Sequence, residues 1–272
     1  MNCPHCHSAR ITRLSRTTDL GYAVFRCQGC GRSFNERTGT PFNFLEVPTD
    51  IVFQVLFCRL RYKLSYREVA ELFLLRGFRF THEAVREWDE RFTRLFADQL
   101  RAKRKGTIGQ VWHVDETYLK IKGQWGYLYR GLDQDGNLVD TRLSAQRDMA
   151  AAKAFFAQAQ DLAGHAPERV VSDGHTPYPR AIAEVLGEAV VHERRSGFAN
   201  PIEQDHRGIK QRYYPMLGLG NLKAAQRFCR AFEAVRQFLR PRQRMGQFVS
   251  LEQRRAHVLK RVKELHRLFA PA

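Results

Sequence analysis

The spacing of apolar residues along the chain changes near residue 107. Before that point, apolar residues recur at three- and four-residue steps, which predicts α-helices. The pattern gives three of them: about Thr49–Leu60, a second from Ser65 to just before Gly77, and a third from Thr81. Short helices joined by a brief turn that contains glycine are typical of a helix-turn-helix, whose last helix enters the major groove of DNA. An ordinary three-helix bundle has the same pattern.

After residue 107, short apolar runs predict strands. Three successive strands are followed by alternating helices and strands, and this order matches the RNase H-like fold, a mixed α/β sheet with helices on its faces. The predicted strands are Val111–Leu119, Tyr127–Leu132, Leu138–Leu143, Arg169–Asp173 and Ala189–His192, and the predicted helices are Met149–Leu162, Pro177–Leu186 and one that contains Glu203.

Two further helices are predicted near the end of the sequence, Asn221–Leu239 and Leu251–Phe269. The last helix places apolar residues along one side, among many basic residues. It therefore covers the core, pairs with a second subunit or lies on DNA, and the sequence does not choose among these.

Four of the six cysteines form two C-x-x-C pairs, Cys3-Pro4-His5-Cys6 and Cys27-Gln28-Gly29-Cys30. Two such pairs separated by twenty residues are a zinc-ribbon signature, because each pair supplies two thiolates to a tetrahedral ion. A ribbon of this size has almost no apolar core, so Zn²⁺ is expected to be its main source of folding energy. His5 and His7 are alternative ligands. The surrounding arginines suggest that the ribbon faces DNA, although a purely structural ribbon is the alternative.

The formal net charge of +17 is unevenly distributed along the chain. Residues 1–106 carry 19 basic and 11 acidic side chains, residues 107–203 carry 10 and 13, and residues 204–272 carry 16 and 4. Basic flanks indicate a polyanionic partner, and a highly charged soluble surface is the alternative. No apolar stretch has the length of a membrane span, and cysteines occupy the N-terminus where a signal peptide needs an apolar core, so we expect a cytoplasmic protein. Cys58 and Cys229 lie in apolar helical patterns and are expected to be small buried residues.

Three acidic residues on three different predicted elements suggest the chemistry: Asp115, Asp173 and Glu203. Divalent cations held by carboxylate oxygens clamp the attacking and leaving oxygens in phosphoryl transfer. The sequence therefore predicts a site for Mg²⁺ or Mn²⁺ that acts on DNA. Each residue also has a plain structural alternative. Asp115 beside Glu116 could form an exposed turn pair, Asp173 could end a strand in an Asx turn, and Glu203 could lie on a helix surface.

Three blocks of the sequence resemble the DDE transposases of bacterial insertion-sequence family six: Trp112–Tyr118, Trp125–Arg130 and Leu143–Asp148. The resemblance extends from about residue 50 to residue 240. The ribbon, with the segment Phe34–Pro41, is similar to that of ribbon-bearing insertion-sequence transposases. Several blocks in the same order are more specific than one short pattern.

The resemblance implies that Asp115, Asp173 and Glu203 are the catalytic carboxylates, the last two separated by 203 − 173 = 30 positions. It also implies that Lys210 is the basic residue seven positions after the glutamate. Seven residues are nearly two helical turns, so Lys210 shares a helix face with Glu203. The chain departs from the family at Gly174-His175, which replaces a common lysine, and this puts details of substrate contact in doubt. A second departure is Ala199-Asn200, where the family commonly has paired asparagines.

The activity implied is binding of the element's ends, followed by metal-dependent 3′-end cleavage and strand transfer. The expected partners are duplex DNA, as terminal inverted repeats and as target, and further copies of the chain in at least a dimer. A non-catalytic DNA-binding regulator and a structure-specific nuclease are the two alternatives. The candidate DNA contacts are His82, Arg86, Arg207, Lys210 and Arg212.

We expect four domains along the chain. They are a zinc ribbon at 1–46, a helix-turn-helix domain with a linker at 47–106, the catalytic domain at 107–220 and a basic helical region at 221–272. Glu116, Asp205 and His206 are expected either to support the catalytic residues or DNA, or to be structural.

Overall fold

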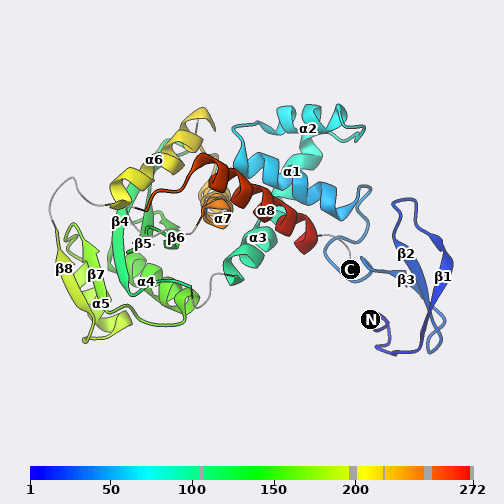
Figure 1. The fold of residues 1–272 in the computed structure, drawn as a ribbon, viewed down its shortest axis with the longest axis horizontal. Coiled ribbons are helices and arrows are strands. Elements are labelled where there is room, and N and C mark those ends of the chain that lie inside the picture. Colours follow the sequence, from blue (N-terminus) through cyan, green and yellow to red (C-terminus); the bar gives the residue numbers. More distant parts are fainter. Residues whose placement is uncertain (104–106, 196–200, 217, 242–246, 270–272) are drawn as a thin grey trace.

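The computed structural model describes residues 1–103, 107–195, 201–216, 218–241 and 247–269. Figure 1 shows an elongated molecule with a small ribbon at one end, helices in the middle and a larger sheet at the other end. Within the described residues, no helix combines the length and the apolar character that crossing a membrane requires. Most of the predicted linker and the departure at Ala199-Asn200 lie outside the described residues.

The N-terminal part is a three-stranded antiparallel sheet in the order β1-β2-β3, formed by β1 (Ile11–Thr17), β2 (Ala23–Cys27) and β3 (Ser33–Asn35). Its buried core holds only Cys3, Cys27 and Phe34, with two partly buried neighbours. So small an apolar core provides little folding energy by itself, as the sequence predicted.

Arg37 joins the ribbon to the first helix. Its guanidinium donates hydrogen bonds to the carbonyls of Val47, at 2.9 Å, and Leu45, at 2.6 Å, and stacks over the ring of Tyr22. The hydroxyl of Tyr22 accepts a hydrogen bond from the backbone N–H of Thr49 at 2.8 Å. Arg37, one of the arginines that surround the cysteine pairs, therefore has a structural role: it connects the ribbon to the segment before α1.

The helical part contains α1 (Thr49–Arg61), α2 (Tyr66–Leu74) and α3 (His82–Ala102), which confirms the three predicted helices. Ser65 and Glu68 form the capping box at the start of α2, and the hydroxyl of Thr81 caps α3. Gly77 follows α2 with a positive φ of 86°, which a glycine adopts without steric cost. α3 continues beyond the predicted region and reaches the larger sheet.

The larger sheet has the strand order β6-β5-β4-β7-β8. β5 pairs antiparallel with β4 and β6, whereas β7 pairs parallel with β4 and β8. This mixed topology is the one that the sequence predicted for an RNase H-like fold. The elements of this part are β4 (Val111–Ile121), β5 (Gln124–Asp133), β6 (Leu138–Ser144), α4 (Met149–Ala163), β7 (Arg169–Ser172), α5 (Tyr178–Leu186), β8 (Val191–Arg194), α6 (Pro201–Tyr213) and the 3-10 turn η1 (Tyr214–Met216).

Alternation along β4 assigns each side chain to one of two faces of the sheet. Trp112 and Val114 pack with α4 and α5 in one buried cluster. Leu119, on the other face, belongs to a second cluster that includes α7 (Leu222–Leu239) and helices α1–α3. This second core crosses the predicted boundaries near residues 106 and 220, and the four-domain division stays a prediction.

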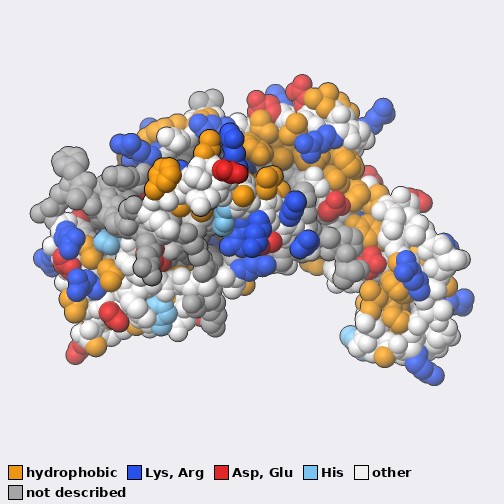
Figure 2. Space-filling model, viewed as in Figure 1, with side chains coloured by type: hydrophobic (Ala, Val, Ile, Leu, Met, Phe, Trp, Pro, Cys, Tyr) orange, Lys and Arg blue, Asp and Glu red, His pale blue; other side chains and the backbone are white. Residues whose placement is uncertain are grey.

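The last helix, α8 (Leu251–Phe269), packs with Leu265 against the core, while Val258 and Val262 are partly buried there. Of the three possible roles, covering the core therefore describes the part of α8 from Val258 to Leu265. Its opposite side is basic, and Figure 2 shows Lys and Arg side chains gathered in the middle of the face where α8 lies. The exposed basic residues of α8 are Arg254, Arg255, Lys260, Lys263 and Arg267.

Candidate active site

The four cysteines of the ribbon converge on one point. The Sγ atoms of Cys3, Cys6, Cys27 and Cys30 all lie within 4.8 Å of one another. The backbone N–H of Cys30, together with that of Gly29, lowers the pKa of the Cys27 thiol to about 6, which favours the thiolate that a metal ion binds. The grouping includes neither of the two alternative histidine ligands. Four sulfur ligands at this separation fit a tetrahedral divalent ion.

Asp115 lies on β4, and Asp173 directly follows the neighbouring parallel strand β7. His113 on β4 pairs in register with Val171 on β7, and each aspartate follows its strand's paired residue by two positions. Because alternate residues share a face, Asp115 belongs to the face that α6 covers. Asp173 lies just beyond the end of β7, where its charge acts on Arg147 and His175. Asp115 is buried and accepts a hydrogen bond from the backbone N–H of Glu116, whereas Asp173 is exposed.

Asp173 forms the Asx turn that the sequence offered as the structural explanation for this residue. Its Oδ1 accepts a hydrogen bond from the backbone N–H of His175 at 3.1 Å. This bond engages one carboxylate oxygen and fixes the side chain at the carboxyl end of β7, which is where ligands gather in α/β sheets. The turn therefore positions the carboxylate and leaves the other oxygen for a ligand.

Helix α6 carries Glu203 across this same face. Ile202 is fully buried against Leu132 and Leu138 of the sheet, so the start of α6 is fixed to β5 and β6. The side chain of Glu203 lies outside the described residues, but its position on the helix is one residue after Ile202 and one turn before His206.

His206 connects α6 with the first aspartate. Its Nδ1 is 3.9 Å from Oδ2 of Asp115. Burial, reinforced by the charges of Arg130 and Lys210, lowers the pKa of His206 to about 3, so the imidazole is neutral near pH 7. Lys210 lies one further turn along the helix and is partly buried. Glu203, His206 and Lys210 therefore follow one stripe of α6 above Asp115.

Arg130 anchors this helix to the sheet. It is the cross-strand partner of Asp115, and its guanidinium is completely buried. It donates a short hydrogen bond to Asp205 of α6, and its Nη2 lies 3.2 Å from Oε1 of Glu233 on α7. Arg236 of α7 also donates to Asp205, at 2.9 Å. Although burial alone would raise the pKa of Asp205, these two arginines lower it to about 2.

Gly208 permits this arrangement. A Cβ added at this position would lie 2.6 Å from the guanidinium carbon of Arg236. The side chain of Arg236 therefore crosses α6 where only glycine leaves room for it.

Glu116 lies on the opposite face from Asp115 and has its own partners. Its carboxylate pairs with Arg147 at 2.5 Å and accepts a short hydrogen bond from the hydroxyl of Tyr178. The imidazole of His175 is 3.7 Å away. Burial, followed by the charge of Glu116, raises the pKa of Tyr178, which stays a hydrogen-bond donor. Sequence reasoning missed Arg147 and Tyr178 as members of this group, since no periodicity relates them to Glu116.

The remaining candidates lie in different environments. Arg86 and His82 are on the accessible side of α3, and Arg86 pairs with Glu83 at 2.5 Å. Arg207 is exposed on α6. Arg212 does not fit its predicted role as a DNA contact, because it is 4 % exposed, donates to the carbonyl of Arg59 at 2.8 Å and stacks over Phe228. Burial lowers its pKa to about 10.

Two further acidic candidates have structural partners. Asp205 and Glu116 are bound by buried arginine and tyrosine groups, so neither carboxylate is directed at solvent. Cys229 is buried as predicted, whereas Cys58 is only partly buried.

The part of the sequence that contains this site is similar to known proteins. A family model for the DDE domain, DDE_Tnp_IS240, matches residues 109–242. The transposase for insertion sequence-like element IS431mec of Staphylococcus aureus strain Mu50 is 34% identical over 175 residues, which cover 63% of this chain and 77% of that protein. The transposase for insertion sequence element IS257 in transposon Tn4003 of Staphylococcus aureus has the same identity and coverage. The catalytic core domain of HTLV-2 integrase, solved in complex with magnesium, superposes with a TM-score of 0.36 at 17% identity, covering 47% of this chain and 86% of that one.

The matched domain and these relatives define the class of the protein as a DDE enzyme, which cleaves and transfers DNA strands with the help of divalent metal. The chain belongs to the DDE transposases of insertion-sequence family six (IS6). This membership favours a transposase over the two alternatives, a non-catalytic regulator and a structure-specific nuclease.

The anchor of α6 leads to a stability prediction. Asp205→Asn removes the charge that neutralises Arg130 while keeping the shape of the side chain, so we expect the free energy of unfolding to fall by about 3–5 kcal/mol, as for other broken buried ion pairs. Urea unfolding followed by circular dichroism measures this change. Asp161→Asn, on the exposed side of α4, is the matched control and should alter stability by less than about 0.5 kcal/mol. Equal stabilities for the two variants would show that Arg130 does not depend on Asp205.

Proposed function

We propose that Asp115, Asp173 and Glu203 are the catalytic carboxylates of this transposase and hold its divalent metal, Mg²⁺ or Mn²⁺. One observation carries the proposal: Asp115 and Asp173 each follow, by two positions, one member of the in-register pair His113 and Val171 on adjacent parallel strands, and the helix that bears Glu203 lies over Asp115. Carboxylate oxygens are the ligands that these hard cations prefer, so the donor set fits the metal. When bound, the metal supplies charge stabilisation for phosphoryl transfer at the DNA backbone.

The side chains around the carboxylates have separate tasks in this proposal. Lys210 and Arg207 extend from α6 and hold the phosphates that flank the scissile bond. His206, being neutral, adds no positive charge beside Asp115 and fills the space between α6 and β4. The two reactions that we assign to the site are 3′-end cleavage by water and attack of the resulting 3′-hydroxyl on a target phosphodiester.

We further propose that the N-terminal parts recognise the element's ends. The exposed side of α3 presents His82 and Arg86 near its N-terminus, which is the end that a recognition helix directs at base edges. Arg86 is paired with Glu83 on the surface, and such an exposed pair costs little to exchange for a DNA contact. Duplex DNA with the element's inverted repeats and target DNA are the partners, and pairing two ends requires at least a dimer.

The ion of the ribbon is proposed to be Zn²⁺. Four cysteine thiolates in a tetrahedral group are typical of a structural zinc site with no open position for catalysis. The four predicted domains remain part of this proposal, with the ribbon and helices serving recognition and the larger sheet serving catalysis. A cytoplasmic location where cysteines stay reduced is consistent with this ligand set.

The catalytic assignment is tested by exchanging each carboxylate for its amide. Asp115→Asn, Asp173→Asn and Glu203→Gln should each reduce strand transfer in Mg²⁺ to background, because an amide keeps the shape of the side chain but loses the charged ligand. Binding of the element's end, measured by gel shift on the same preparations, should stay nearly unchanged. Asp135→Asn in the β5–β6 turn is the control and should keep full activity. Wild-type joining by any of the three variants would remove that residue from the site.

For the ribbon, we expect one Zn²⁺ per chain, bound by Cys3, Cys6, Cys27 and Cys30. The double variant Cys27→Ser, Cys30→Ser should lose the ion, and the ribbon should unfold because metal binding supplies its folding energy. Metal analysis and limited proteolysis measure the two effects. Cys58→Ser is the control and should retain one zinc. Full occupancy in the double variant would refute the assignment.

The recognition proposal predicts different effects for two basic residues. Arg86→Ala should weaken binding to the element's own end more than binding to random duplex, by about 1–3 kcal/mol of discrimination. Lys210→Ala should weaken binding to both duplexes by a similar factor and reduce the salt slope by about one, because a phosphate contact is blind to sequence. Competition titrations across salt concentrations distinguish the two. An equal loss on both duplexes for Arg86→Ala would assign end recognition to the ribbon instead.

A further inference from the structure

A cleft lies beside the hairpin that joins β4 to β5. It forms where β7 has ended at Ser172 and the free edge of β4 is covered by the end of α6 and the chain that follows it. The hydroxyl of Tyr213 accepts from the backbone N–H of Lys120 and donates to its carbonyl, each at 2.8 Å. The N–H of Lys122 donates to the carbonyl of Leu219 at 2.9 Å. These bonds form one wall of a cleft of about 620 Å³.

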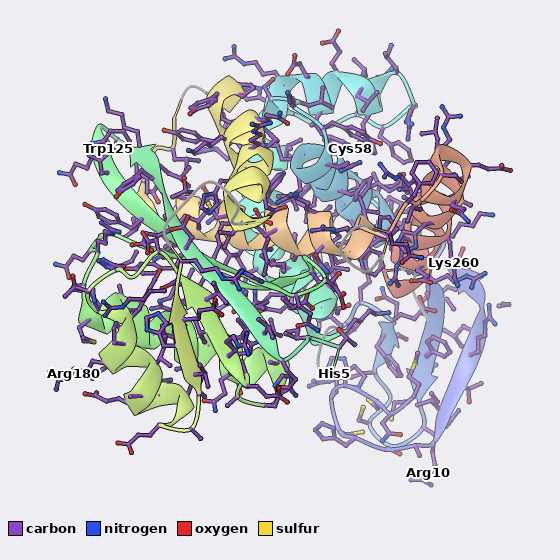
Figure 3. All side chains as sticks on the ribbon, turned by 60° about the vertical axis from the view of Figure 1, so that its left-hand side comes forward. His5, Arg10, Cys58, Trp125, Arg180 and Lys260 are labelled. Carbon is purple, nitrogen blue, oxygen red and sulfur yellow. The ribbon has the colours of Figure 1, made fainter. Side chains whose placement is uncertain are left out.

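Aromatic rings are exposed around this cleft. Trp125 is 59 % exposed, Tyr214 is 64 % exposed and Tyr118 is 46 % exposed. The other two tryptophans, Trp88 and Trp112, are buried. Figure 3 shows Trp125 at the far end of the hairpin, pointing away from the body of the sheet. Exposed aromatic side chains that gather at one place mark a surface that binds a partner.

The charge of the cleft is positive. Lys120 and Lys122 line it, and none of the described residues that line it is acidic. The ammonium of Lys120 lies 6.0 Å from the centre of the Trp125 ring, and Tyr118 meets that ring edge to face at 6.2 Å. The rings are therefore held in place by their neighbours, with cations on the same side.

The turn of the hairpin has an unusual residue. Lys122 has a φ of 47° and Gly123 a φ of 84°, with Ile121 and Gln124 paired on either side. Two-residue turns of this kind favour Asn or Gly at the first position, because a larger side chain is strained there. The lysine at this strained position places a positive charge at the tip of the hairpin, beside the cleft.

We propose that this cleft binds unpaired nucleotides of single-stranded DNA, with bases stacked on Trp125 and Tyr214 and phosphates held by Lys120 and Lys122. Aromatic platforms combined with a basic groove are the means by which proteins bind single strands without reading their sequence. The inference rests on the proposed function, because the DNA strand that we assign to the cleft is one that extends from the proposed catalytic site. Tyr118 follows Asp115 on β4 by three residues, about 10 Å along the strand. Alternation puts the two side chains on opposite faces, so the bound strand passes around the edge of β4 to reach the cleft.

Charge argues against a second copy of the chain as the occupant. The protein carries a formal net charge of +17, and two lysines at the cleft would meet a partner that is itself strongly basic. A polyanion has the complementary charge.

Tryptophan fluorescence tests the proposal, because Trp125 is the accessible tryptophan. Titrating the full-length protein with an eight-nucleotide oligothymidylate, without added divalent cations, should quench its emission. Trp125→Ala should abolish the quenching and weaken binding, measured by anisotropy of a labelled oligonucleotide, by between about five-fold and a hundred-fold. Trp125→Phe, which keeps a ring, should recover most of the affinity. Lys120→Ala combined with Lys122→Ala should reduce the slope of log affinity against log salt by about 1.4.

Phe44→Ala is the matched control, since Phe44 is 91 % exposed just before the N-terminal end of α1, whereas the other end of that helix is the one that contacts α6, and this variant should bind like wild type. Wild-type oligonucleotide affinity in Trp125→Ala would overturn the proposal. So would a loss of self-association in that variant with unchanged affinity for DNA, which would assign the cleft to a second copy. Strand transfer by the wild-type protein is measured separately. If it is absent while quenching persists, the proposed catalytic function fails and the cleft stands.

Discussion

The buried charge of Arg130 is the constraint on which the catalytic face depends. This guanidinium lies inside the sheet beside Asp115, where an unpaired charge would cost several kcal/mol. Asp205 from α6 and Glu233 from α7 neutralise it, and Arg236 binds Asp205 from the other side. Both helices must therefore approach the sheet in one orientation, which sets the stripe of α6 that carries Glu203, His206 and Lys210 above Asp115. Without these ion pairs, nothing in this group would hold α6 in the orientation that brings its stripe over Asp115.

Strand register supplies the second requirement. β7 runs parallel to β4 and ends after Ser172, so Asp173 leaves the sheet two positions after Val171, the in-register partner of His113. The same early end of β7 leaves one edge of the far half of β4 without a strand neighbour, and the last residue of α6 together with Leu219 covers that edge. The early end of β7 thus bears on both of our proposals, the shared metal site of the carboxylates and the aromatic cleft for single-stranded DNA.

Much of this arrangement could be predicted from the sequence, because it follows local rules. Apolar spacing located the helices and strands, the Ser65–Glu68 pair marked the start of α2, and the cysteine pairs indicated the metal group. Long-range polar contacts could not be predicted, since no local pattern relates Arg130 to Asp205 or Glu116 to Tyr178. Arg212 shows the same limit: its position on α6 suggested a DNA contact, but contact with Phe228 and the carbonyl of Arg59 buries it.

The central claim is that three carboxylates from β4, the end of β7 and α6 share one divalent metal site. Anomalous diffraction from crystals of the protein grown or soaked with Mn²⁺ tests it most directly. The account predicts an anomalous peak at the carboxyl end of β7, within bonding distance of carboxylate oxygens from Asp115 and Asp173, with the side chain of Glu203 directed at the same peak. A fully occupied manganese site elsewhere, or a peak at Asp115 with Glu203 turned away from it, would contradict the account.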